Sequence, residues 1–266
     1  MFIHNINPYI LSIGNIHFRY YGLVYAIGFI IVYLVLLNSA KKEKIKNLTE
    51  PIVDKFIIYI IFSIIIGGRL GEVIFYNLPY YLANPLRILM IWQGGMSFHG
   101  ALIAIVIVSY LFCKKYKIDF LELADVISIP AAFVLFLGRI ANFINAELIG
   151  KISNAWYCID YSNYGIQGCR HPSQLYEAAK NLVIGLFLMF EYNFLNKKKT
   201  SHNKNKGAVF FSFISLYGLL RFFINFYRDD PIIFLGLITG QIFSFAMLLI
   251  GLILLLHLRI SSSKKE

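Results

Sequence analysis

Three side chains that could act together on an anionic substrate lie in otherwise apolar stretches of this sequence. They are His99, Arg139 and Arg221. A guanidinium binds phosphate or carboxylate through two parallel hydrogen bonds and keeps its positive charge at any physiological pH. An imidazole can take up a proton near neutral pH. Together these residue types suit a reaction in which an anionic group is held while a proton moves.

Some of the charged residues also have a simpler structural interpretation. A lone histidine in an apolar helix is commonly an interior residue, but the segment 94–100 around His99 contains three glycines, which would let a ligand approach closely. Arg69 and Glu72, spaced i,i+3, could be a structural ion pair at a helix end. Glu177 could be no more than an anion near a helix N-terminus. The sequence leaves both interpretations open for these residues.

A second group of polar residues recurs at helical spacing near the C-terminus. Tyr217, Arg221, Asn225 and Arg228 fall at about 0°, 40°, 80° and 20° around a helix of about 3.6 residues per turn. Such a stripe must face protein or ligand, because lipid tails cannot satisfy it. The sequence therefore predicts that all four side chains share one inward face.

The elements that must position these residues follow from hydropathy. Hydrophobic residues make up 58% of the chain and charged residues only 15%, and the mean hydropathy is +0.66. These values are outside the range of ordinary soluble domains and predict an all-α integral membrane protein, a single polytopic domain over residues 1–266. We expect about seven transmembrane helices, at residues 20–40, 56–75, 88–113, 121–138, 173–195, 207–226 and 233–258.

The distribution of positive charge predicts the topology. Sixteen of the 25 Lys and Arg residues lie in segments 41–55, 114–117, 197–206 and 259–265, which seven spans place on one side. By the positive-inside rule that side is the cytoplasm, so the N-terminus is outside and the C-terminus cytoplasmic. The net charge of +11 is then a topology signal, and we expect no nucleic acid partner. Most of the remaining basic residues are arginines on the outer side, which predicts an outer-face polar cavity with a small extracytoplasmic excursion over residues 139–171.

The three cysteines exclude a disulfide framework or a four-cysteine zinc site. Cys158 and Cys169 fall in the outer excursion, where a disulfide would persist, and the sequence leaves their pairing open. No fourth ligand at a zinc-like spacing accompanies them with His171, so we expect no metal site. Cys113 is predicted to be a packed thiol, and Asp125 a solvated or paired charge at a helix end.

Several separated motifs, taken in order, resemble one family over nearly the whole chain: the bacterial prolipoprotein diacylglyceryl transferases. The motifs that carry the resemblance lie at residues 19–23, 67–71, 94–100, 125–150, 170–177, 217–222 and 240–241. Three alanines, Ala101, Ala141 and Ala146, stand where the family usually has glycine. Asn225 stands where the family commonly has an acidic residue, which puts in doubt an ion pair from this position to Arg221 or Arg228.

The resemblance implies a transferase of the bacterial cytoplasmic (inner) membrane with its active site facing the outer leaflet. It implies transfer of the sn-1,2-diacylglyceryl group from phosphatidylglycerol to the cysteine thiol of a prolipoprotein signal peptide. The products would be a thioether and glycerol phosphate, in the first step of lipoprotein maturation. No cofactor is expected, and the partners are phosphatidylglycerol, signal peptides and the lipid bilayer.

Site residues follow from the resemblance together with the chemistry above. We expect catalytic roles for His99, Arg139, Arg221 and Tyr21. His99 is the candidate base for the thiol, the two arginines would hold the phosphate, and Tyr21 would bond the lipid headgroup. We expect substrate-binding roles for a wider set: Gly100, Arg139, Asn142, Asn145, Glu147, Gln174 and Tyr217.

Three other classes of protein are compatible with a helical membrane chain. A transporter or channel would show polar residues in both membrane halves and commonly inverted repeats, whereas the inner halves here are mostly apolar. A retinal-binding receptor would need a lysine in the seventh helix, and residues 233–258 contain none. A non-enzymatic lipid-binding scaffold is not excluded by motifs alone.

Overall fold

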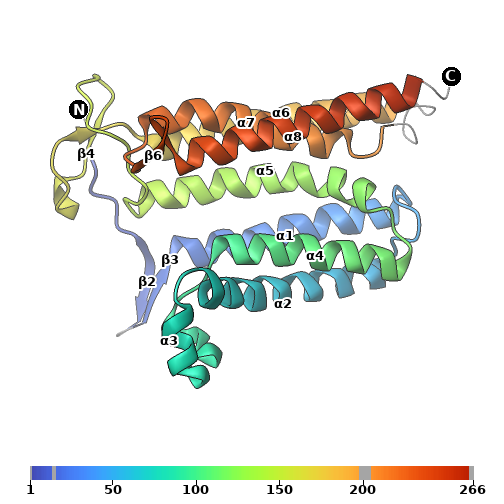
Figure 1. Ribbon diagram of the computed structural model, residues 1–266, viewed down its shortest axis with the longest axis horizontal. Coiled ribbons are helices and arrows are strands. Elements are labelled where there is room, and N and C mark those ends of the chain that lie inside the picture. The colour runs from blue at the N-terminus through green and yellow to red at the C-terminus, as the bar shows by residue number, and fades with distance from the viewer. Residues whose placement is uncertain (1, 14–15, 198–204, 264–266) are drawn as a thin grey trace. The chain divides into compact units, whose positions relative to one another are not determined.

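The computed structural model describes residues 2–13, 16–197 and 205–263, without the side chains of residues 12–19, 21, 197, 234 and 261–263. Seven helices in this described part are long and apolar enough to cross a membrane. This confirms the prediction of a mostly helical chain with seven candidate spans (Figure 1). They are α1 (Tyr20–Lys41), α2 (Glu50–Phe75), α4 (Phe98–Tyr116), α5 (Phe120–Ile144), α6 (Ser173–Lys197), α7 (Ala208–Ile224) and α8 (Thr239–Ser263).

The predicted start of the third span, residue 88, is wrong by ten residues. Between α2 and α4 the chain forms the short helix α3 (Leu78–Ala83) and two 3₁₀ turns, η1 (Pro85–Leu89) and η2 (Ile91–Gln93). Gly94 and Gly95 then take φ values of +85° and +76°, which a continuous helix cannot contain. Helix α4 begins only after Ser97, whose Oγ accepts the Gly100 backbone N–H at 3.1 Å as an N-cap.

Three other boundaries also differ from the prediction. Helix α2 begins at Glu50, before the predicted residue 56. Helix α5 continues to Ile144, so residues 139–144 of the expected excursion are helical. The last span begins at Thr239, because β6 (Ile232–Phe234) and β7 (Leu237–Ile238) pair antiparallel before it.

The chain divides into two compact units, which are described separately. The first unit consists of Met1–Val32 and Ala124–Glu266, and the second of Tyr33–Leu123. In the first unit a core of Ala132, Ile184, Leu188 and Val209 joins α5, α6 and α7. Helix α8 lies beside α7 (Figure 1).

Asp125 has a structural role that the sequence did not indicate. It is buried, and its carboxylate accepts the backbone N–H groups of Gly207 at 2.7 Å and Phe210 at 2.8 Å. These are orphan donors at the start of α7, whose N-cap residue is a glycine without a side chain of its own. Of the two expected alternatives, a solvated charge is wrong: the carboxylate is paired, and its partners are backbone N–H groups of a neighbouring helix.

Helices α2 and α4 of the second unit pack through glycines. A Cβ atom on Gly100 would lie 2.3 Å from the carbonyl oxygen of Gly67 and 2.6 Å from the Cα of Gly71. Small residues at such a crossing let two backbones approach closely, which is a common way for helices to associate in a membrane. Gly100 therefore sets the distance between the helix that carries His99 and α2.

A small sheet ties the N-terminus to the excursion in the first unit. Strand β4 (Ile159–Asp160) pairs with β5 (Cys169–Arg170) antiparallel and with β1 (Phe2–Ile3) parallel. A disulfide joins Cys158 to Cys169, which settles the pairing left open above. Next to β1, the fully buried His4 bonds through Nε2 to the Phe143 carbonyl at 2.8 Å and stacks on Tyr161.

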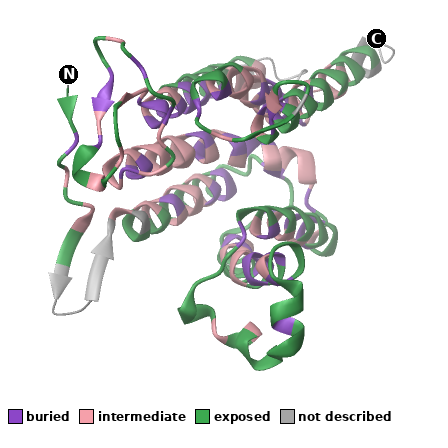
Figure 2. Cartoon of the chain, turned by 60° about the vertical axis from the view of Figure 1, so that its left-hand side comes forward, coloured by how far each residue is buried: buried purple, intermediate pink, exposed green. Residues whose placement is uncertain are grey.

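Many large apolar side chains are exposed along the long helices. Figure 2 shows how much of these helices is exposed. Phe190 is 69% exposed and Ile253 62%. Exposed apolar faces of this extent are costly in water and favourable in hydrocarbon, so they support the assignment of these helices as membrane spans.

The glycine contact between α2 and α4 predicts a selective loss of stability. Gly100→Ala forces backbone atoms apart, so we expect a destabilisation of about 1–3 kcal/mol, as for overpacked cores. The measurement is the thermal unfolding midpoint of the purified protein in detergent. The matched control is Gly138→Ala, also in a helix, where a Cβ would meet nothing within 4 Å. Equal midpoints for the two variants would contradict the packing role.

The buried His4 predicts that attachment of the N-terminal segment depends on pH. Burial lowers the pKa of His4 below its ordinary value of 6.5, partly offset by the bond to Phe143. The folded segment thus holds a neutral imidazole, and its stability is fully present above pH 6.5 and is lost as pH falls below that value. Hydrogen exchange of the His4 amide, which donates to the Asp160 carbonyl at 2.8 Å, should speed up at pH 5 relative to pH 7.5 after correction for intrinsic rates. His4→Phe should abolish this extra pH dependence; equal protection of the wild type at both pH values would refute it.

Candidate functional site

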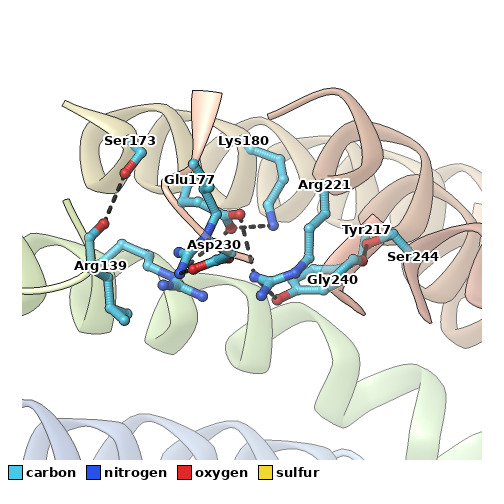
Figure 3. Close-up of polar contacts among 11 residues, drawn as sticks. Arg139, Ser173, Glu177, Lys180, Tyr217, Arg221, Asp230, Gly240 and Ser244 are labelled. Atoms are coloured by element: carbon cyan, nitrogen blue, oxygen red, sulfur yellow. Dashed lines mark hydrogen bonds and ion pairs between the residues drawn. The ribbon is translucent and has the colours of Figure 1, made fainter. Parts of the chain in front are cut away.

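The most concentrated group of charges in the first unit surrounds the carboxylate of Glu177 (Figure 3). Lys180 Nζ lies 2.7 Å from Oε2, Arg221 NH1 lies 3.3 Å from Oε1, and Arg139 Nε lies 3.8 Å from Oε2. Tyr217 completes the group, since its hydroxyl accepts Arg221 NH1 at 3.2 Å and its ring centroid is 3.7 Å from Lys180 Nζ. We call these five residues the Glu177 cluster. The cluster shows that Glu177 is not merely a helix N-terminal anion.

The residues of the Glu177 cluster come from three helices and lie at one end of the first unit. Arg139 lies in the last two turns of α5, Glu177 and Lys180 in the first turns of α6, and Arg221 in the last turn of α7. The start of α6 is held in place because the Ser173 hydroxyl donates to the Leu148 carbonyl at 2.8 Å. Tyr217 and Arg221 are spaced i,i+4, which puts their side chains on one face of α7.

Burial separates the charges of the cluster into an inner and an outer pair. The side chains of Glu177 and Lys180 are 0% and 2% exposed, whereas those of Arg139 and Arg221 are 14% and 23% exposed. The four charges sum to an excess of two positive charges, and the excess belongs to the more accessible arginines. Uncompensated buried charge is costly, so this arrangement is suited to an incoming anion.

The segment after α5 brings most of the predicted amide and carboxylate groups together. Asn142 Nδ2 donates to Glu147 Oε2 at 3.5 Å, and Gln174 Nε2 donates to the Glu147 carbonyl at 2.7 Å. Ala146 and Leu148 have φ values of +53° and +54°, an uncommon conformation for residues other than glycine. A segment held in this strained form by hydrogen bonds is typical of a functional site.

Asn145 differs from its neighbours in its hydrogen bonding. Both polar atoms of its side-chain amide are buried, and neither has a hydrogen-bond partner within the described part of the chain. Buried amides are normally satisfied, so an unpaired one at a candidate site is consistent with a group that a ligand would bond.

The predicted polar stripe of four residues on one helical face is wrong. Helix α7 ends at Ile224, and a 3₁₀ turn, η4 (Asn225–Tyr227), follows it. The turn redirects the chain, so Arg228 bonds Asp230 at 2.7 Å and does not join Arg221. Asn225 is 1% exposed and lies against Gly240. Only Tyr217 and Arg221 of the four residues belong to the Glu177 cluster.

His99 and Gly100 belong to the second unit. His99 is exposed at the second position of α4, and its Nδ1 lies 3.2 Å from the Tyr76 hydroxyl. If Nδ1–H donates to Tyr76, the Nε2 atom carries the free lone pair that a base needs. Gly100 is buried in the contact with α2 described above.

Arg69 and Glu72 do not pair with each other in the described structure. Arg69 is 5% exposed and donates to five carbonyls of the segment between α2 and α4, at Arg87, Ile88, Met90, Gly94 and Gly95. Glu72 instead accepts Asn77 Nδ2 at 2.7 Å. The ion-pair interpretation is therefore wrong, and Arg69 organises the segment that leads to α4.

Some expectations lie outside what the structure describes. The side chain of Tyr21 is among those not described, so its role stays a prediction. Within the described residues no group of three or more His, Cys, Asp or Glu side chains could hold a metal ion.

Two residues at these sites were not found from the sequence. Lys180 could have been suspected, because it is a lone lysine within an apolar helix, three residues after Glu177. Tyr76 carried no such signal, since a tyrosine at the end of a span is ordinary in a membrane protein.

Fold and site together define a polytopic helical membrane protein with a buried, cation-rich polar cluster at the end of three helices. Comparison with known proteins narrows this class. Residues 8–257 match the family model described as prolipoprotein diacylglyceryl transferase, and the chain belongs to this family. Relatives named phosphatidylglycerol–prolipoprotein diacylglyceryl transferase include that of Rickettsia typhi, 43% identical over 263 residues, or 97% of this chain and 99% of the relative. That of Ehrlichia ruminantium is 39% identical over 262 residues, covering 97% and 98%.

Proposed function

We propose that this chain transfers the diacylglyceryl group of phosphatidylglycerol to the cysteine thiol of a prolipoprotein signal peptide. Membership of the family and relatives of nearly equal length that carry this name support the activity. The single observation that carries the proposed site is the Glu177 cluster, in which three cations share one carboxylate.

The charge change of the reaction fits this cluster. The thiol sulfur forms a bond to the glyceryl carbon that bears the phosphate, and the carbon–oxygen bond breaks, with its electron pair leaving on glycerol phosphate. The phosphodiester carries one negative charge, and the phosphate monoester approaches two near neutral pH, because its second pKa is about 6. A cluster with an excess of two positive charges therefore stabilises the leaving group more than the substrate, which is the condition for catalysis.

Arg139 and Arg221 are the residues that would hold the phosphate. Each has a partly exposed side chain, 14% for Arg139 and 23% for Arg221, and a guanidinium with five N–H donors in all. Their fork geometry matches two phosphate oxygens, which a lysine cannot do. Tyr217 would orient Arg221 through the hydroxyl bond described above.

The strained segment after α5, together with Asn142 of α5 and Gln174 of α6, would bind the glycerol part of the lipid. Asn142, Asn145, Glu147 and Gln174 offer amide and carboxylate groups suited to hydroxyls, and the unpaired amide of Asn145 is the most direct candidate. Tyr21 would bond the headgroup.

His99 would take the proton of the thiol. A cysteine thiol has an unperturbed pKa of about 8.5, so only a small fraction is thiolate near neutral pH. We assign the base role to Nε2 of His99, with Tyr76 orienting the ring through Nδ1. Gly100 would keep His99 in place by allowing α4 to approach α2.

The location follows from charge distribution and family. The lysine-rich segments 41–55, 114–117 and 197–206 mark the cytoplasmic side. The chain would therefore lie in the bacterial cytoplasmic membrane with the Glu177 cluster toward the outer leaflet, on the same side as the disulfide-bonded excursion.

Replacing either arginine by lysine tests the fork geometry. Arg139→Lys and Arg221→Lys keep the charge but lose bidentate bonding, so we expect each to lower kcat/KM by at least about tenfold. The assay incubates purified protein with phosphatidylglycerol and a signal peptide and weighs the peptide by mass spectrometry. Arg87→Lys, at an exposed arginine outside the cluster, is the control and should retain activity. Near-normal transfer by Arg221→Lys would rule out bidentate capture at that residue.

A histidine variant tests the base. His99→Gln can still form hydrogen bonds but cannot accept a proton, so we expect turnover at pH 7 to fall by about 10²-fold or more, as for loss of general base catalysis. Raising the pH toward 9 should recover part of the rate, because more of the substrate thiol is then ionised. Full turnover of His99→Gln at pH 7 would eliminate the base assignment.

A further inference from the structure

The environment of Lys180 separates it from the two arginines. Its side chain is 2% exposed, so it cannot reach a bound substrate. Its ammonium group touches the Glu177 carboxylate at 2.7 Å and lies 3.7 Å from the centre of the Tyr217 ring. Both contacts are favourable for a cation that has been removed from water.

Glu177 has one negative charge and three cations in reach, so the cations compete for it. Lys180 has the shortest contact, 2.7 Å, whereas the nearest nitrogens of Arg221 and Arg139 stand off at 3.3 and 3.8 Å. Neither arginine makes the paired, short contacts of a bidentate bond to the carboxylate, which would be about 2.7–2.9 Å. Lys180 is thus the nearest cation to the Glu177 carboxylate and the most deeply buried.

Removal of Lys180 would change this balance. A buried carboxylate without its lysine gains most by closing onto a guanidinium, and both arginines are near enough to turn toward it. The Glu177 cluster would fall from an excess of two positive charges to one. The guanidinium groups of Arg139 and Arg221 would then turn toward the carboxylate and away from the substrate phosphate.

We propose that Lys180 is a positioning residue that occupies Glu177 and so leaves Arg139 and Arg221 available to the phosphate of the lipid substrate. This inference rests on the proposed function. It assigns Lys180 no contact with the substrate, and its effect is exerted through the carboxylate alone.

The experiment is a double-mutant cycle on KM for phosphatidylglycerol. Lys180→Met keeps the length of the side chain without its charge and should raise KM about tenfold, with a smaller change in kcat. Adding Glu177→Gln removes the competing carboxylate and restores the excess of two positive charges, so the double variant should return KM to within about threefold of the wild type. Lys180→Arg, which keeps a cation beside Glu177, should also stay within about threefold.

If the role of Lys180 were purely structural, the double variant would not have a lower KM than Lys180→Met. Loss of packing or of an ion pair would leave the KM of the double variant as high as that of Lys180→Met, and that result overturns the inference. A KM unchanged in Lys180→Met overturns it as well. Because the double variant lacks both members of the buried pair, it also supplies a readout if Lys180→Met is recovered in low yield.

The same measurements separate this inference from the proposed function. If Arg139→Lys and Arg221→Lys lose activity while Lys180→Met binds lipid normally, only the role of Lys180 fails. If all three variants keep wild-type KM and kcat, the phosphate is held elsewhere and the proposed site fails too.

Discussion

The buried carboxylate of Glu177 is the contact that allows three cations to lie together in the candidate site. Without it, Arg139, Lys180 and Arg221 would place three like charges within a few ångströms of one another in a medium of low dielectric constant. The carboxylate makes their approach tolerable and still leaves two positive charges uncompensated. The ends of α5, α6 and α7 therefore carry an excess of positive charge that a bound anion would neutralise. Under the proposed function, a lipid phosphate that gains negative charge during the reaction would be bound most favourably here when the carbon–oxygen bond breaks.

The surrounding structure protects this arrangement at the ends of the three helices. At the cluster, the Ser173 hydroxyl fixes the first turn of α6 to the strained segment at Leu148. Asp125 of α5 caps the start of α7, at the opposite end of these helices. A disulfide closes the excursion after α5. Together these bonds fix the start of α6, the start of α7 and the loop after α5.

Hydropathy was sufficient to predict the seven spans, because the requirement for about 20 apolar residues is local and strong. Arg139 and Arg221 could also be named as candidate site residues from the sequence, because a guanidinium within a membrane span is energetically costly. The predictions that proved wrong concerned features that depend on turns and tertiary contacts. The start of α4 is set by two positive-φ glycines, and the 3₁₀ turn at Asn225 breaks the expected stripe. The role of Lys180 depends on which cation comes nearest to Glu177, and spacing along one helix does not reveal that.

The most direct test of the account is an experimental structure of the protein with phosphatidylglycerol bound, at a resolution that shows the phosphate oxygens. We expect the phosphate to lie within hydrogen-bonding distance of the guanidinium groups of both Arg139 and Arg221, with Lys180 still bonded to Glu177. A phosphate bound away from both arginines, or Glu177 closed onto either guanidinium while the lipid is bound, would contradict it.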